Sequence, residues 1–220
     1  MKEYFELLSA SPLFQGIGGD ELESMLQCLG ARTIDVPKGD PVFLEGDAAG
    51  FIGIVLEGSI QVVQEDFFGN RNVIHHSREG DIFAEAFSFT GLDTMPVSGY
   101  AVKNSRVMLL SCIRMMTVCA NACGFHNRLV KNLLQLVSRK NMMLSEKIRY
   151  MSKKTTREKL LAFLSAQAKQ AGSPEFTIPF DRQSLADYLG VERSAMSAEI
   201  GKLQKDGILQ SKGSFFRITQ

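Results

Sequence analysis

A stretch from Gly124 to Met151 contains no proline, and its single glycine stands at the start. Apolar side chains recur along it at alternating spacings of four and three residues, which is the pattern of a coiled-coil seam. The seam positions are Val130, Leu134, Val137, Asn141, Leu144, Ile148 and Met151. The spacing therefore predicts one long helix that presents an apolar face to a second helix.

A second stripe lies on another face of the same predicted helix. Its positions are Leu129, Leu133, Leu136, Lys140 and Met143. A helix with two stripes can bury one against its own domain and the other against a partner, so we expect a parallel homodimer. Asn141 is the single polar residue of the seam, and a buried asparagine at such a position fixes register and two-stranded assembly. The alternative is a monomer in which both stripes form one wide apolar face.

Before this helix, short β-rich runs alternate with glycine-containing turns between Lys38 and Ser111. The runs read PVFL, FIGIVL, SIQVVQE, NVIHH and RVMLLS, and the turns between them include EGD, LEG and REGD. Several short strands separated by turn signals predict an antiparallel barrel or sandwich. We therefore expect a β-domain ahead of the long helix.

After SKKTT, residues 152–156, the pattern changes to short helices. The segment DRQSLADYLG predicts a helix that is capped by Asp181 and closed by Gly190. ERSAMSAEIGKLQKDG predicts a second helix, and ILQSKGSFFRIT predicts a strand, a turn and a strand. This order is the layout of a winged helix-turn-helix. The alternative is an ordinary helical hairpin with a solvated outer face.

The second helix of this pair would present polar side chains outward. They are Glu192, Arg193, Ser194, Ser197, Ala198 and Lys202, with the small Ala198 among them. Such a helix fits the major groove of DNA, and the planar fork of Arg193 can donate twice to a guanine edge. Charge agrees with this: residues 1–150 carry 14 Lys+Arg and 17 Asp+Glu, whereas residues 151–220 carry 11 and 7. The basic excess favours a polyanion-binding C-terminal end.

The segment DRQSLADYLGVERSAMSAEIGKLQKDGIL resembles the helix-turn-helix of the Crp/Fnr family of transcription regulators. The glycine-punctuated β-region, the residues from Gly80 to Ser98, the SEKI stretch at 145–148 and the order of the parts extend the resemblance over nearly the whole chain. It implies an α+β fold: an N-terminal antiparallel β-roll of the cyclic-nucleotide-binding type (1–123), a dimerisation helix (124–151) and a winged helix-turn-helix (152–220). It further implies a cytoplasmic, non-enzymatic homodimer that binds a palindromic operator in double-stranded DNA under the control of an effector, with RNA polymerase as a further partner.

The resemblance also implies roles for single residues. Arg182 and Gln183 would contact phosphates, while Arg193, Ser194 and Ser197 would lie at the bases, and Lys202 completes the expected DNA-binding set. Several relatives have a glutamate and a second arginine where this chain has Ser194 and Ala198. We therefore expect a half-site that differs from that of the best-known members.

The stretch GDIFAEAFSF…PVSGY resembles the cassette that binds cyclic nucleotides. The resemblance puts Ala84 where a glycine is usual, Glu85 on the ribose-binding glutamate, Val97 on the phosphate-binding arginine and Ser98 on the phosphate-binding hydroxyl. Loss of the arginine removes a charge-assisted bond of roughly 1.5–3 kcal/mol, so cyclic AMP is not the expected effector. We expect a small, mostly apolar effector in a pocket formed by Phe83, Ala84, Glu85, Ala86, Val97, Ser98, Leu144 and Ser145. The alternative is that the aromatic residues only pack the roll and no effector exists.

Cysteine and histidine positions limit the remaining classes. One branch of the family binds an iron–sulfur cluster through an N-terminal cysteine group, and here only Cys28 precedes residue 100, so no such cluster is expected. No metal site is expected either. The alternative is a redox- or metal-responsive regulator that uses Cys119, Cys123 and His126, or haem at His75 or His76. An enzyme is not expected, because no nucleophile elbow and no glycine-rich phosphate loop is present.

Overall fold

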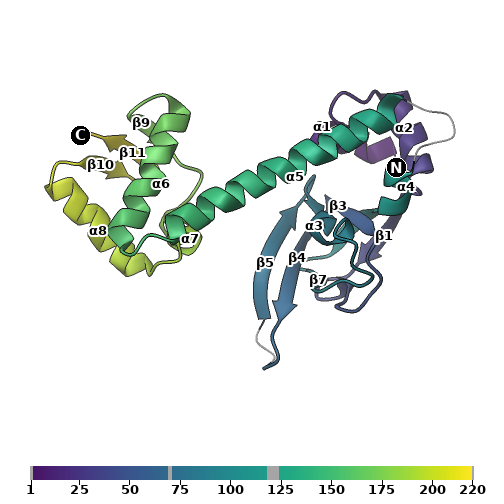
Figure 1. The fold of residues 1–220 in the computed structure, drawn as a ribbon, viewed down its shortest axis with the longest axis horizontal. Coiled ribbons are helices and arrows are strands. Elements are labelled where there is room, and N and C mark those ends of the chain that lie inside the picture. The colour runs from purple at the N-terminus through teal and green to yellow at the C-terminus, as the bar shows by residue number, and fades with distance from the viewer. Residues whose placement is uncertain (1, 69–70, 118–123, 220) are drawn as a thin grey trace. The chain divides into compact units, whose positions relative to one another are not determined.

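The computed structural model describes residues 2–68, 71–117 and 124–219. The chain forms two compact units, Met1–Ser138 and Arg139–Gln220, and the division falls within the long helix α5 (Gly124–Met151). The first unit is rich in strands and the second in short helices (Figure 1). The helix bounds agree with the proline-free stretch that the sequence predicts.

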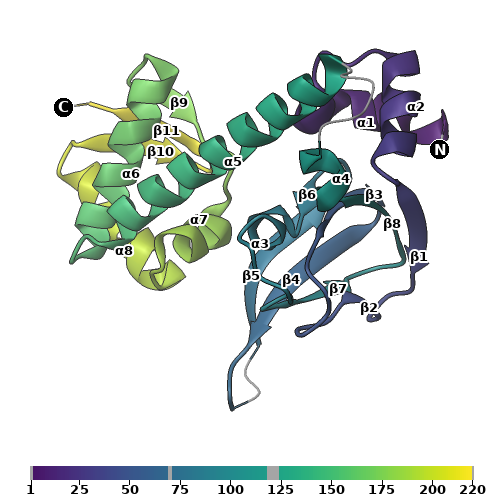
Figure 2. The same ribbon diagram turned by 45° about the vertical axis from the view of Figure 1, so that its right-hand side comes forward.

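The strands described in the first unit form two antiparallel four-stranded sheets, ordered β1-β8-β3-β6 and β2-β7-β4-β5. The strands are β1 (Arg32–Val36), β2 (Pro41–Phe43), β3 (Phe51–Glu57), β4 (Ser59–Glu65), β5 (Arg71–Arg78), β6 (Ile82–Phe83), β7 (Ser98–Ala101) and β8 (Ser105–Ser111). Strands β4 and β5 form a long hairpin that projects from the second sheet (Figure 2). The antiparallel β-domain expected from the glycine-separated runs and the β-roll that the resemblance implies are confirmed.

Two stacked phenylalanines fill the space between these sheets. The rings of Phe43 on β2 and Phe83 on β6 have centroids 6.3 Å apart and lie 7° from parallel. A Cβ atom at Gly53 would lie 1.9 Å from the Phe83 ring, and one at Gly99 would lie 2.3 Å from the Phe43 ring. The two glycines therefore make room for the two rings, and the interior of the roll is a packed core.

Short helices cover the outer side of the first sheet. They are α1 (Phe5–Ala10), α2 (Gly19–Cys28) and α4 (Cys112–Met116), together with 3₁₀ turns at Lys2–Tyr4 and Pro12–Phe14, while α3 (Glu85–Ser88) follows β6. Leu129 and Leu133 of α5 are buried in the same cluster as α1 and α2. The buried Asn132 amide donates to the carbonyls of Leu13 at 3.0 Å and Gln15 at 2.9 Å. The first half of the second stripe, at Leu129 and Leu133, thus packs on its own domain.

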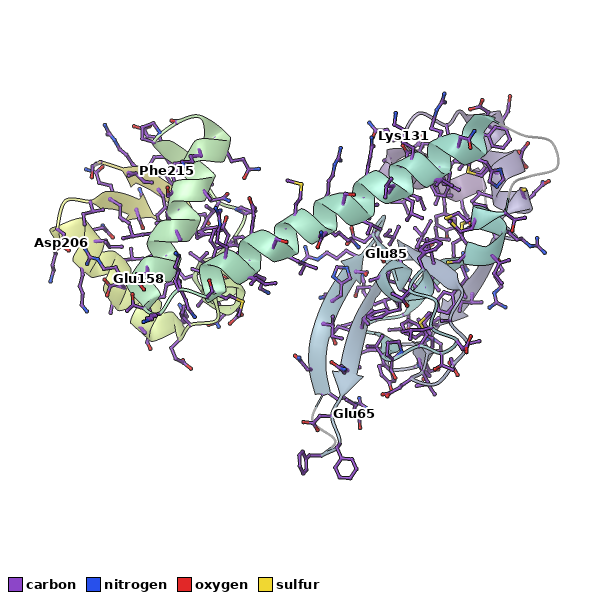
Figure 3. All side chains as sticks on the ribbon, in the orientation of Figure 1. Glu65, Glu85, Lys131, Glu158, Asp206 and Phe215 are labelled. Carbon is purple, nitrogen blue, oxygen red and sulfur yellow. The ribbon has the colours of Figure 1, made fainter. Side chains whose placement is uncertain are left out.

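The second unit is a small helical domain with a three-stranded antiparallel sheet, ordered β10-β11-β9. Its elements are α6 (Thr156–Ala171), β9 (Glu175–Thr177), α7 (Arg182–Leu189), α8 (Arg193–Lys205), β10 (Leu209–Lys212) and β11 (Phe215–Ile218). Thr155 and Glu158 form a reciprocal capping box that starts α6. Figure 3 marks Glu158 near the start of α6, Asp206 at the end of α8 and Phe215 on β11. We refer to β10, β11 and the turn between them as the wing.

Candidate functional site

The turn between α7 and α8 is fixed by local features of the chain. Oδ1 of Asp181 accepts a hydrogen bond from the Ser184 amide at 2.7 Å, which caps α7 and lowers the pKa of the Asp181 carboxyl. Gly190 ends α7 with a φ of 60°, a left-handed conformation that glycine adopts without strain. Both the cap and the stop lie where the sequence predicts them.

Helix α8 has one buried face and one exposed face. Met196, Ile200 and Leu203 are buried and pack in the core of the domain. The polar side chains of Arg193, Ser194, Ser197 and Lys202 are exposed. An exposed polar helix face that is held by a packed core is the kind of surface that enters the major groove.

A cavity of about 520 Å³ lies where the start of α7, the start of α8 and the wing meet. It is lined by Asp181, Arg182, Gln183, Arg193, Gly213 and Ser214. Arg193 is exposed at this opening, and an exposed guanidinium favours an anion such as a backbone phosphate. Of these lining residues, the sequence predicted Arg182, Gln183 and Arg193 as DNA contacts. It missed the wing residues, although the turn signal SKGS could have pointed to them.

The two residues expected at DNA phosphates have partners inside the domain. Arg182 donates through Nη2 to the hydroxyl of Ser211, and its guanidinium lies 4.9 Å from the ring centroid of Phe216. Burial lowers the pKa of Arg182. The Gln183 amide donates to Oδ1 of Asp187 at 2.8 Å. The structure thus brings both side chains to the cavity but engages them with protein groups.

A charged network that sequence reasoning missed connects α6 to α8. Arg157 donates to Glu199 at 3.2 Å and to Asp206 at 3.0 Å, and Lys202 contacts Glu199 at 3.4 Å. The hydrogen bond to Asp206 is the main cause of a raised pKa for Arg157. These contacts fix the middle and the end of α8, while Arg193 at the start of the helix stays exposed to solvent.

Charge separates the two units sharply. The first unit, residues 1–138, carries 10 Lys+Arg against 16 Asp+Glu, a formal charge of −6. The second unit, residues 139–220, carries 15 against 8, a formal charge of +7. A positive field around the helix-turn-helix favours association with a polyanion.

In the roll, the cassette region turns sharply at Ala84. Its φ of 66° makes it the one non-glycine residue with a left-handed conformation in the described part of the chain. This conformation costs an alanine roughly 1–2 kcal/mol, and the resemblance places a glycine here. The turn starts α3 at Glu85, which is 6% exposed and is labelled in Figure 3.

The other predicted effector residues fall into different surroundings. Phe83, Ala84 and Val97 belong to the packed core of the roll, where Val97 is 2% exposed. The Ser98 hydroxyl accepts a hydrogen bond from the Glu45 amide at 2.9 Å, and Ala86 is exposed. Leu144 and Ser145 belong to the second unit and are exposed there. This arrangement favours the interpretation in which the aromatic residues pack the roll.

The predicted seam of α5 is largely exposed. The exposed apolar positions along it are Leu134, Val137, Leu144, Ile148 and Met151, with Asn141 also exposed and Val130 half-buried. A regular apolar stripe of this length on a helix surface marks an interaction face. Leu129 and Leu133 of the second stripe are buried, but Met143 is exposed, so that stripe packs only along the first half of α5.

The metal and redox alternatives find little support among the described residues. Cys119 and Cys123 lie outside them. His126 is buried and has Cys28 at 4.0 Å from its Nε2 atom, while His75 and His76 are exposed on β5. Within residues 2–68, 71–117 and 124–219, no group of three or more His, Cys, Asp or Glu is placed to hold a metal ion. In the same ranges no helix combines the length and the apolar character that crossing a membrane requires.

Comparison with protein families identifies both halves of the chain. Residues 33–121 match the cyclic nucleotide-binding domain, and residues 158–220 match the Crp-like helix-turn-helix domain. Among curated proteins, the chain is 24% identical over 204 residues to electron transport regulator A of Shewanella oneidensis, covering 90% of this chain and 78% of that protein. It is 26% identical over 204 residues, with the same coverage, to the fumarate and nitrate reduction regulatory protein of Escherichia coli strain K12.

Solved structures share the fold. The structure of DNR from Pseudomonas aeruginosa has a TM-score of 0.54 at 20% identity, covering 100% of this chain and 95% of that one. The regulator CLP of Xanthomonas campestris, described as responsive to c-di-GMP, has a TM-score of 0.55 at 20% identity, covering 90% and 98%. A cyclic-nucleotide-binding-type roll, a long helix and a winged helix-turn-helix in this order define a DNA-binding transcriptional regulator. The chain belongs to the Crp/Fnr family of such regulators.

Proposed function

We propose that the protein acts as a homodimer that binds a two-fold symmetric operator, with one α8 in each of two successive major grooves. The observation that carries this proposal is the exposed polar face of α8 on a domain of formal charge +7. Arg193 reads a base edge, Ser194 and Ser197 lie at neighbouring bases, and Gln183 and Lys202 contact the backbone. Arg182 is left out of this set because its guanidinium binds Ser211 and its Nη1 atom is buried, whereas the side chains of Gln183 and Lys202 are exposed. RNA polymerase is the proposed partner, and the cytoplasm is the proposed compartment.

The exposed seam of α5 supports the dimer. Leu144 is 59% exposed and Ile148 is 67% exposed, and pairing with a second copy of the helix would bury both. Asn141 would then face its counterpart and fix the register of the two helices. Dimerisation sets two recognition helices at a fixed separation, so the half-sites are expected about one helical turn of DNA apart.

The roll supports an effector other than cyclic AMP. Val97 stands at the position of the phosphate-binding arginine and is packed in the core, so no cation at this position can meet a phosphate. Phe83 and Phe43 occupy the interior beside it. We therefore propose that any effector is a mostly apolar or weakly polar molecule. Calorimetric titration with cyclic AMP should show no binding, and a micromolar Kd would contradict this part of the proposal.

The dimer and its operator can be tested together. Duplexes selected by the protein from a random-sequence library should converge on an inverted repeat. Leu144→Asp should sediment as a monomer and lose the selected duplex, because it puts a charge into the apolar seam. Met142→Asp is the matched control, since Met142 is 67% exposed on the same helix but outside the seam, and it should stay dimeric. Selection of a single unrepeated site, or a dimeric Leu144→Asp, would refute the arrangement.

A further inference from the structure

Arg182, the first residue of α7, contacts two wing residues that face each other across the sheet. Ser211 on β10 and Phe216 on β11 are a cross-strand pair in the antiparallel register. The Arg182 guanidinium donates through Nη2 to the Ser211 hydroxyl and lies over the Phe216 ring, 4.9 Å from its centroid. One side chain thus binds both strands of the wing at the same level.

The orientation of this arginine differs from that of a phosphate contact. An arginine that binds DNA phosphate turns its planar fork toward solvent, where two of its N–H groups can meet two oxygens. Nη1 of Arg182 is instead buried and has no hydrogen-bond partner among the described residues. Its burial also lowers its pKa. A half-buried guanidinium with one buried nitrogen left without a hydrogen bond is costly to keep, which points to a role that an apolar side chain would not fill.

A second link attaches the wing to the segment that precedes α7. The hydroxyl of Ser214, in the wing turn, donates to the carbonyl of Phe180 at 2.9 Å. The Ile178 amide donates to the carbonyl of Ser214 at 3.0 Å. Lys212, the last residue of β10, and Gly213 of the turn are exposed, and in the chain they lie between Ser211, which Arg182 contacts, and Ser214. The turn of the wing is therefore held on both sides.

We propose that Arg182 is a positioning residue that fixes the wing against the start of α7, so that the wing turn and Arg193 border one DNA-binding cavity. The proposal rests on the DNA-binding function proposed above. Arg182 acts through Ser211 and Phe216 and keeps these two contacts when DNA binds. Lys212 and the backbone of Gly213 then meet the duplex at a set distance from the recognition helix.

Ser211→Ala tests this directly, because it breaks the link while the charge of Arg182 remains. The probes are the duplex selected by the wild-type protein and a scrambled duplex of equal length, each titrated at several salt concentrations. We expect Ser211→Ala to weaken binding of the selected duplex by about threefold or more with an unchanged salt slope. In the Arg182→Met background, Ser211→Ala should have no further effect, since the two residues act through one contact.

A phosphate contact by Arg182 predicts the opposite pattern. Arg182→Met would then lower the salt slope by about one unit, and Ser211→Ala would leave affinity unchanged or raise it by freeing the guanidinium. That result would overturn the proposal. Amide exchange of the wing, measured without DNA, tests the Arg182–Ser211 link independently of the proposed DNA-binding function. If no duplex binds the wild-type protein, the proposed function fails, whereas faster exchange in β10 and β11 of Ser211→Ala still supports the link and unchanged exchange refutes it.

Discussion

Replacement of Phe83 by alanine tests whether its ring packs the interior of the roll or borders an effector pocket. Phe83 is fully buried, stacks on Phe43 and covers Gly53, which has no side chain to fill the space that the ring would leave. Truncating a buried phenylalanine costs roughly 3–5 kcal/mol when the surroundings cannot collapse. The strands on both sides hold their positions through sheet hydrogen bonds, so we expect about 4 kcal/mol.

Native-state amide exchange followed by mass spectrometry suits this measurement, because it reports on the roll separately from the other unit. The chain contains no tryptophan, so tryptophan fluorescence cannot serve as the probe. A loss of about 4 kcal/mol should speed exchange of the most protected amides in β3 and β4 by roughly a thousandfold. Phe67→Ala is the matched control: Phe67 is 99% exposed, and its truncation should change stability by less than about 0.5 kcal/mol.

A loss below about 1 kcal/mol in Phe83→Ala would refute the reasoning. It would mean that the ring borders open space, as it would in an effector pocket, and that the stacking on Phe43 contributes little. An apolar ligand that restored protection in the variant would identify the new cavity as dry and able to bind.

Two further predictions concern pH. Burial raises the pKa of the Cys112 thiol to about 11, so the folded state keeps a proton that the unfolded state loses from about pH 8.5 upward. The free energy of unfolding should therefore fall between about pH 9 and pH 11. The denaturant midpoint of Cys112→Ala should decline less over the same pH range. The Asp181 carboxyl has a lowered pKa because it accepts a hydrogen bond from the Ser184 amide. Its contribution to the stability of α7 is therefore present above about pH 4 and is lost as the pH falls through the folded pKa. Asp181→Ala should remove this pH dependence from the exchange of α7 amides and should weaken operator binding at neutral pH.

The parts of the fold that local signals encode were predictable from the sequence. The Asp181 cap and Gly190 stop bound a helix within a few residues of themselves, so the turn before α8 could be placed without knowledge of the rest of the chain. The proline-free stretch with its alternating spacings likewise gave the bounds of α5. Both signals depend on residues that are close together in the chain.

Contacts between distant residues left no such signal. Arg182 meets Ser211 only because β10 and β11 pair in one register, and nothing around Arg182 in the sequence indicates this. The same holds for Phe43 and Phe83, whose rings fit because Gly53 and Gly99 leave space on other strands. The residues of the cassette could therefore be aligned by resemblance, but whether their side chains line a pocket or fill a core depends on packing that only the fold determines.

The identity of the base-reading residue gives the most direct test of the account. The ratio of affinities for the selected and the scrambled duplex should be measured at one salt concentration for the wild-type protein, Arg193→Ala and Lys205→Ala. Arg193 is exposed at the start of α8, and Lys205 is an exposed cation at its end. We expect Arg193→Ala to lower the ratio by roughly five- to 150-fold, through the loss of about 1–3 kcal/mol of base discrimination, and Lys205→Ala to leave it unchanged. An Arg193→Ala protein with the wild-type ratio would contradict the placement of α8 in the major groove.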